Sequence, residues 1–130
     1  MYLGHLIDER LNEGLEPHGL SLPKLSVLQH LVQAGEPLPL GVLSERFGCV
    51  KSNITQLVDR LEADKLVRRV PDPEDRRSVL AAITEEGRKR YSAGRRALEE
   101  VESQILESLS ASDREQLSGL LSRFHQRPNQ

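Results

Sequence analysis

Apolar residues recur with helical spacing along most of this chain, which predicts a mainly helical protein. The first run covers residues 2–15 and is followed by Pro17 and Gly19, residue types that end helices. A second run begins after Ser21, which can cap a helix N-terminus, and stops at Gly35. The first third of the chain therefore predicts two helices joined by a short turn.

Two longer helical runs are predicted in the second half of the chain. Thr84 can cap the first of them, which extends to about Ser108. Tyr91, Leu98 and Ile105 repeat every seven residues along this helix, and a seam of this kind packs on another helix. The sequence Ser-Asp-Arg-Glu at 112–115 predicts a capping box that opens the last helix.

The middle of the chain predicts helix, turn and helix. Residues 38–40 form a candidate edge strand, because Pro39 has no backbone N–H to donate. A short helix follows and ends at Gly48, and a second helix is predicted at 51–64. The apolar positions of this second helix follow the spacing of a buried face: Ile54, Leu57, Val58 and Leu61.

A β-hairpin is predicted directly after these helices. Two β-prone runs, at 66–70 and 78–83, flank a polar and charged tip. Helix, turn, helix and basic hairpin in this order describe a winged helix-turn-helix, whose second helix is shaped to enter a major groove. The predicted fold class is mainly α with a small antiparallel β wing.

The stretch from residue 43 to 87 resembles the MarR family of bacterial transcriptional regulators. The sequence Asp-Pro-Glu-Asp-Arg-Arg at 72–77, followed by a hydrophobic strand and a Thr-x-x-Gly motif at 84–87, carries the resemblance most specifically. More loosely, the resemblance extends over nearly the whole chain. It implies a homodimeric repressor that binds a pseudo-palindromic duplex and is released by a small anionic aromatic effector.

The same resemblance implies a division of the single domain into parts. The expected parts are a DNA-binding lobe at 21–87, a long linking helix at 85–108, and dimerisation helices at 1–20 and 108–130. In MarR-like proteins the first and last two helices make the two-fold dimer interface. The apolar first and last helices of this chain fit that arrangement.

The distribution of charge along the chain is more informative than the net charge. The chain of 130 residues has a formal net charge of −2, which by itself argues weakly against a nucleic-acid partner. Residues 1–45 hold two basic and six acidic side chains, whereas residues 46–77 hold eight basic and six acidic ones. The positive segment coincides with the predicted DNA-binding face.

The second helix of the motif supplies the first group of candidate DNA contacts. These are Lys51, Ser52, Asn53, Thr55, Gln56 and Arg60. Asn and Gln suit contacts with adenine, whereas Ser, Thr, Lys and Arg suit phosphate oxygens. The alternative is an ordinary soluble helix face. Gln56 stands where many MarR-like proteins have Arg, and Val50 where they usually have a Ser or Thr cap, so no base preference is carried over.

The hairpin supplies the second group of candidate contacts. The resemblance implies that Arg77 enters a minor groove, that Asp75 holds the Arg77 guanidinium, and that Arg76 contacts phosphate. An ordinary solvated turn is the alternative, since Pro, Asp and Glu are common in turns. Arg69 or Arg68 is expected to contact the phosphate backbone, but not both, because strand alternation sends them to opposite faces.

Cysteine and histidine give weaker hypotheses. Cys49 precedes a helix N-terminus, which favours a reactive thiol, but a small buried side chain is the favoured interpretation. His18 and His30 flank the second helix and are candidate ligand contacts, with surface histidines as the plainer alternative. Neither the His nor the Cys spacing matches a zinc site, so no metal and no cofactor are expected.

Several other classes of protein are disfavoured. No catalytic motif appears, so an enzyme is not expected. One cysteine and the lack of a leader or a long apolar run favour a cytoplasmic protein. The remaining rival is a winged-helix module that binds protein and not DNA. Such a module would present an apolar or acidic outer face on the second helix of the motif, whereas the outward positions of this helix are polar and weakly basic and the wing is basic.

Overall fold

The computed structural model describes residues 3–48 and 51–125. In chain order the elements are α1 (Leu3–Leu15), the 3-10 turn η1 (Glu16–His18), α2 (Leu22–Ala34), β1 (Leu38–Pro39), α3 (Leu40–Phe47), α4 (Lys51–Ala63), β2 (Val67–Pro71), β3 (Val79–Ile83), α5 (Glu85–Glu107) and α6 (Ala111–His125). This mainly helical chain with a small antiparallel sheet confirms the predicted winged helix-turn-helix class.

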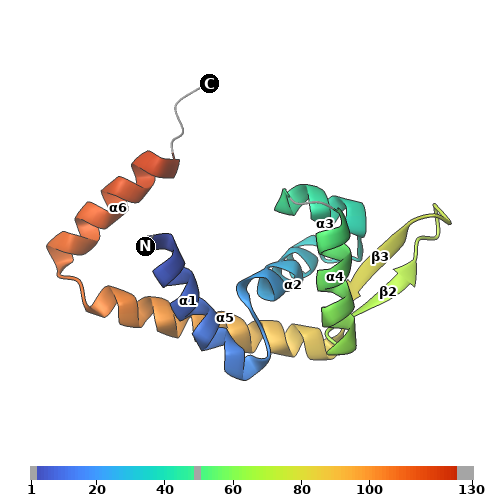
Figure 1. The fold of residues 1–130 in the computed structure, drawn as a ribbon, viewed down its shortest axis with the longest axis horizontal. Helices are drawn as coiled ribbons and strands as arrows, with labels where there is room; N and C mark the ends of the chain where they lie inside the picture. The colour runs from blue at the N-terminus through green and yellow to red at the C-terminus, as the bar shows by residue number, and fades with distance from the viewer. Residues whose placement is uncertain (1–2, 49–50, 126–130) are drawn as a thin grey trace.

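The long helix α5 joins two parts of the molecule (Figure 1). A lobe made of α2, α3, α4 and the sheet lies at its N-terminal end, and the β2–β3 hairpin projects outward from this lobe. Helix α1 lies across α5, and α6 leaves the far end of α5 at an angle. The DNA-binding motif predicted from the sequence is thus one compact unit, connected to the terminal helices by α5.

The sheet has the strand order β1-β3-β2, and both pairs of neighbours are antiparallel. Leu38 of β1 lies opposite Ala81, and Val67 of β2 lies opposite Ile83. β1 is an edge strand, as its proline predicts, because the missing N–H of Pro39 leaves no ladder bond unmade. Both strands of the hairpin begin one residue later than the sequence pattern indicated.

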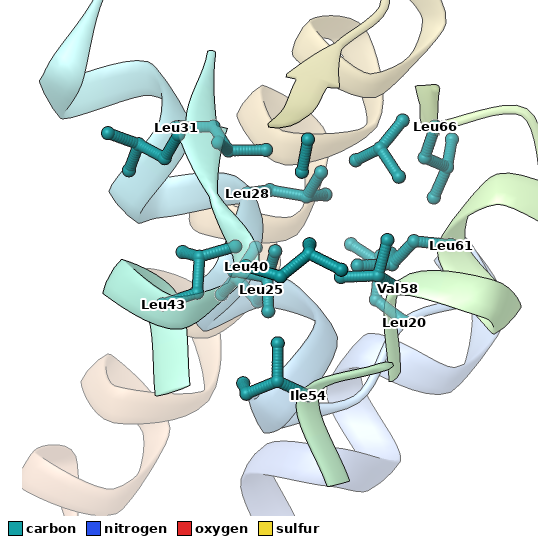
Figure 2. Close-up of a cluster of buried hydrophobic side chains, with 14 of the residues drawn as sticks. Leu20, Leu25, Leu28, Leu31, Leu40, Leu43, Ile54, Val58, Leu61 and Leu66 are labelled. Carbon is teal, nitrogen blue, oxygen red and sulfur yellow. The ribbon is translucent and has the colours of Figure 1, made fainter. Parts of the chain in front are cut away.

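Leucine and valine side chains from three helices and the sheet form the core of the lobe (Figure 2). Leu28, Leu43 and Val58 are fully buried, and they come from α2, α3 and α4 respectively. Helix α2 begins where Ser21 Oγ accepts a hydrogen bond from the backbone N–H of Lys24 (3.4 Å). Burial of one face of each helix therefore fixes which face of α4 remains in solvent.

The heptad seam of α5 packs inside the chain, against α1 and the start of α2. A Cβ added to Gly94 would lie 2.7 Å from Leu20 Cδ1, and one added to Gly14 would lie 2.6 Å from Val101 Cγ2. An alanine at either position would therefore force the neighbouring side chain to shift. Leu98 of the seam is buried at 6% exposure. The described part of the seam is thus largely covered by the chain's own α1.

Helix α6 is capped by a different serine from the one predicted. Ser110 Oγ accepts a hydrogen bond from the N–H of Asp113 (3.1 Å), and Asp113 Oδ2 accepts one from the N–H of Ser110 (3.2 Å). The capping box is therefore Ser110–Asp113, and the prediction of residues 112–115 was wrong by two positions. Both serines are followed three residues later by an acidic side chain, and it is the earlier one that caps the N-terminus of α6, which begins at Ala111. At the start of α5 the predicted cap is confirmed, since Thr84 Oγ1 accepts from the N–H of Gly87 (2.9 Å).

Apolar side chains outside the core gather on the terminal helices. Leu120, Leu121 and Phe124 of α6 are 50%, 56% and 79% exposed. Leu6 and Ile7 of α1 are also exposed. No helix within residues 3–48 and 51–125 is both long enough and apolar enough to cross a membrane.

Candidate nucleic-acid interface

Helix α4 has one buried face and one polar face in solvent. Ile54, Val58 and Leu61 are buried, and Leu57 is half-buried. The exposed side chains are those of Ser52, Asn53, Gln56, Asp59 and Arg60, and Thr55 is half-buried. The structure therefore brings together the candidate base contacts Asn53 and Gln56 on the outer face of the helix. Cys49 and the side chain of Lys51 lie outside the described part of the chain.

The tip of the hairpin is held in shape by its own polar groups. The Asp72 carboxylate accepts a hydrogen bond from the N–H of Glu74 (2.9 Å), and the N–H of Ser78 donates to the carbonyl oxygen of Asp75 (3.0 Å). Below the tip, the N–H of Asp72 donates to the carbonyl oxygen of Ser78 (3.3 Å). These bonds give the loop a defined conformation of the kind that short polar side chains stabilise.

Asp75 contacts Arg77 through the backbone. Asp75 Oδ1 accepts a hydrogen bond from the N–H of Arg77 (3.0 Å). Among the described residues, no ion pair joins this carboxylate to the Arg77 guanidinium. The expected guanidinium contact is therefore replaced by an Asx turn, which a short carboxylate two residues upstream forms readily. Arg76 and Arg77 both have exposed side chains.

The two strand arginines differ in their surroundings. Arg68 is exposed, whereas Arg69 is folded against α4. Arg69 Nη2 lies 2.6 Å from Asp59 Oδ1, and Arg69 Nη1 lies 2.7 Å from Glu62 Oε1. The guanidinium also donates to the carbonyl oxygen of Thr55 (3.3 Å). Sequence reasoning offered either arginine for a phosphate contact, and the structure leaves Arg68 as the accessible one.

The backbone of β2 adds a fourth contact to this cluster. The N–H of Arg69 donates to Glu62 Oε2 (3.0 Å). This backbone donor first, and the guanidinium second, hold the pKa of the Glu62 carboxylate below its ordinary value. Sequence reasoning missed the cluster, although a signal was present. Val67 is buried, so the residue two positions later on the same strand turns toward the same side.

The two candidate histidines lie in different parts of the fold. His18 lines a hollow of about 580 Å³ between η1 and α5, and its carbonyl oxygen accepts a hydrogen bond from Arg90 Nη1 (3.0 Å). His30 packs between α2 and α3, with its ring centroid 5.0 Å from that of Phe47 and its Nδ1 2.7 Å from the carbonyl oxygen of Ser26. In the described ranges, no group of three or more His, Cys, Asp or Glu side chains is arranged to hold a metal ion.

Comparison with known proteins gives the same assignment as the geometry. A sequence model of the MarR family matches residues 18–78. The HTH-type transcriptional regulator MhqR of Bacillus subtilis is 35% identical over 81 residues, which cover 62% of this chain and 55% of MhqR. The uncharacterized HTH-type transcriptional regulator YwoH of the same organism is 31% identical over 121 residues, covering 93% of this chain and 87% of YwoH. The chain thus spans little more than half the length of MhqR and most of the length of YwoH.

Solved structures extend the likeness to the whole fold. A MarR-family transcriptional regulator from Rhodococcus sp. RHA1 superposes with a TM-score of 0.78 at 29% identity, over 94% of this chain and 86% of that chain. A mutant MarR from E. coli complexed with operator DNA superposes with a TM-score of 0.77 at 23% identity, over 93% and 86% of the two chains, and shows the fold alone. Together with the helix-turn-helix and the Asp-Pro-Glu-Asp-Arg-Arg wing, these likenesses establish that the chain belongs to the MarR family of transcriptional regulators.

Proposed function

We propose that this protein binds duplex DNA as a two-fold homodimer and represses transcription. The observation that carries the proposal is the outer face of α4. Within residues 52–60 its exposed side chains are all polar, and within residues 52–63 none of them is a large hydrophobic residue. The rival protein-binding module requires an apolar or acidic patch at this position. Membership in the MarR family of transcriptional regulators supports the same function.

The proposed contacts divide between the two grooves and the backbone. Asn53 and Gln56 of α4 read base edges in the major groove, because their amides can pair with adenine. Arg77 enters the minor groove beside it, where narrow A·T-rich segments attract arginine. The remaining proposed contacts are to phosphates and come from Lys51, Ser52, Thr55, Arg60, Arg68 and Arg76.

The terminal helices support a dimer. Leu106, Leu117, Leu121 and Phe124 line a wide hollow of about 880 Å³ between α5 and α6. Exposed apolar surface of this kind marks a contact with another molecule. We assign it to a second copy of the chain, so that α1, α5 and α6 of both protomers form the interface and the two α4 helices face successive turns of a pseudo-palindromic operator.

An effector that releases the DNA completes the proposal. The hollow beside His18 is bordered by the basic residues Lys89 and Arg90 and by the acidic residues Glu16 and Glu86. Arg90 already pairs with Glu86, at 3.2 Å from Nη2 to Oε1, so Lys89 is the cation that we assign to a small anionic aromatic compound. The hollow lies next to α5, which connects the lobe to the proposed dimer helices. A ligand there changes the separation of the two α4 helices. Isothermal calorimetry with benzoate and phenolic acids tests this, and absence of binding across the series would remove effector control.

Selection from a random-sequence pool of duplexes tests DNA binding directly. The immobilised protein should enrich sequences with inverted repeats whose centres lie about one helical turn apart. Affinity for the enriched duplex should then exceed that for unselected DNA by about a thousandfold or more. A pool that stays random after repeated rounds would overturn the proposal and favour the protein-binding module.

A further inference from the structure

Arg69, Asp59 and Glu62 form a cluster that joins the hairpin to α4, and we call it the wing clasp. Arg69 bonds to both carboxylates and to the Thr55 carbonyl oxygen, at distances between 2.6 and 3.3 Å. Thr55, Asp59 and Glu62 lie on successive turns of α4, on the side turned toward β2. One guanidinium thus spans two turns of the helix that carries the candidate base contacts.

The clasp also includes the free edge of the sheet. Among the strands of residues 3–48 and 51–125, β2 neighbours β3 alone in the order β1-β3-β2, and the bond from the Arg69 N–H to Glu62 places α4 at its other edge. Glu62 Oε2 accepts the N–H of Arg69 from that edge (3.0 Å), while Glu62 Oε1 accepts from the Arg69 side chain (2.7 Å). A carboxylate held by both the backbone and the side chain of one residue fixes the strand in position as well as in direction.

The charge balance of the clasp is unfavourable for a phosphate contact. Two carboxylates lie against one guanidinium, and the Arg69 side chain is only 25% exposed. A phosphate would have to displace Asp59 or Glu62 and would then meet a carboxylate without its partner. Arg68, one residue earlier, points to the opposite face and is exposed.

We infer that Arg69 is a positioning residue for DNA binding: with Asp59 and Glu62 it sets the angle and spacing between the wing and α4. This inference rests on the function proposed above. A wing held in register allows Arg77 to reach the minor groove while α4 occupies the major groove of the same half-site. Without the clasp, the two contacts are no longer presented together, and binding must order the wing first.

Glu62→Gln tests the inference, because its two effects on the affinity for DNA have opposite signs. The substitution is nearly isosteric and removes a negative charge from the lobe, so electrostatics alone would tighten binding to DNA. If the clasp positions the wing, the same substitution weakens binding. We expect a loss of roughly three- to thirtyfold for the duplex enriched by the wild-type protein, the range for residues that act through the arrangement of a site.

Glu74→Gln is the matched control. It is the same substitution on an exposed carboxylate of the same hairpin, outside the clasp. Its affinity should be unchanged or higher. Arg69→Gln should weaken binding at least as much as Glu62→Gln, because it also removes the guanidinium contacts to Asp59 and to the Thr55 carbonyl oxygen. The double variant should lose less than the sum of the two single losses, since both substitutions remove the ion pair between Arg69 and Glu62.

The salt dependence of DNA affinity distinguishes a positioning residue from one that contacts a phosphate. Removing a phosphate contact lowers the slope of log K against log salt by about one per contact, hence about two per dimer. Arg68→Gln should show this change, whereas Arg69→Gln should keep the wild-type slope. Hydrogen exchange without DNA gives a second readout. Residues 67–71 and 79–83 should exchange faster in Glu62→Gln, while α2 keeps its protection.

These measurements decide whether Arg69 is a positioning residue. If Glu62→Gln binds as tightly as Glu74→Gln, or if Arg69→Gln lowers the slope as Arg68→Gln does, Arg69 is not a positioning residue. If α2 loses protection together with the hairpin, the cluster stabilises the lobe as a whole and the inference fails. If the wild-type protein enriches no duplex, the proposed function falls, and hydrogen exchange still decides whether the clasp holds the hairpin.

Discussion

Asp75 accepts a hydrogen bond from the backbone N–H of Arg77, at 3.0 Å from Oδ1 to the nitrogen. The carboxylate therefore shapes the chain at the wing tip and does not hold the arginine side chain. Arg77 follows this turn and its side chain is exposed. We therefore expect the oxygen of Asp75 as an acceptor, and not its charge, to matter for DNA binding.

Asp75→Asn is the variant that separates these two roles. Asn keeps an oxygen at the same position, so the turn should persist and the affinity for the enriched duplex should match the wild type or exceed it. Asp75→Ala removes the acceptor and should weaken binding by several-fold, because ordering the loop then opposes binding. Equal losses for both variants, measured by fluorescence anisotropy, would show that the charge itself matters.

Arg77→Ala should weaken binding to the enriched duplex by far more than about tenfold. One lost charged contact costs about 1–3 kcal/mol, and the two-fold dimer loses two such contacts. Secondary structure by circular dichroism and the oligomeric mass should stay unchanged, because the exposed side chain supports neither. A variant with wild-type affinity would mean that the wing tip does not reach DNA, and the protein-binding module would become the better proposal.

Acid should destabilise the protein partly through Glu62. Its folded-state pKa is lowered by the Arg69 N–H and guanidinium, so the unfolded chain binds the proton more readily. The resulting stabilisation is fully present above the ordinary Glu pKa of about 4.3 and is lost as pH falls through the lower folded value. In urea unfolding, the wild type should therefore exceed Glu62→Gln in stability near neutral pH and converge with it in acid. A constant difference across this range would contradict the assignment.

Gly94→Ala should destabilise the joint between α5 and the lobe. The new Cβ would lie 2.7 Å from Leu20 Cδ1 and 3.0 Å from Leu25 Cδ1, so both leucines must shift. Overpacking of this kind costs about 1–3 kcal/mol, part of which the better helix propensity of alanine offsets. Gly41→Ala in α3 is the control, since outside its chain neighbours and its own helix backbone no atom lies within 4 Å of the added Cβ. Its unfolding midpoint should stay the same or rise slightly.

The sequence was sufficient for the elements of the fold, because helical and strand periodicities are local properties. It could not decide what the α5 seam packs against. A heptad repeat fits a partner helix from another chain as well as from the same one. The choice depends on Gly14 and Gly94, whose small size lets α1 and α2 approach α5.

At the candidate site, too, the features set by local spacing could be predicted, whereas those set by tertiary contacts could not. The outer face of α4 follows from the spacing of Ile54, Val58 and Leu61, and the structure confirms the resulting exposure of Asn53 and Gln56. The role of Arg69 does not follow from spacing. Its partners come from a helix seven and ten residues upstream, and only the angle between α4 and the hairpin brings the charges together.

The cap of α6 gives a test of local structure. Ser110→Ala removes the oxygen that accepts from the N–H of Asp113 and should cost about 1 kcal/mol. Ser112→Ala removes a side chain within the helix and should have little effect. Hydrogen exchange at residues 111–116 should become faster only in Ser110→Ala. If Ser112→Ala had the larger effect, the capping box would be the one at residues 112–115 that the sequence pattern indicated.

The dimer is tested by placing a charge in the apolar surface of α6. Leu121 is 56% exposed and lines the hollow between α5 and α6, so in the proposed dimer it becomes buried. Leu121→Glu should shift the mass measured by sedimentation at micromolar concentration from twice the 14.6 kDa chain toward the single chain. An unpaired charge at a buried interface costs several kcal/mol, whereas the same side chain in water costs nothing. Val79→Glu is the control, because Val79 is an exposed apolar residue at 39% exposure on β3, away from the terminal helices. Val79→Glu should leave the dimer intact. A wild-type protein that sediments as a monomer while binding an inverted repeat tightly would refute the proposed assembly.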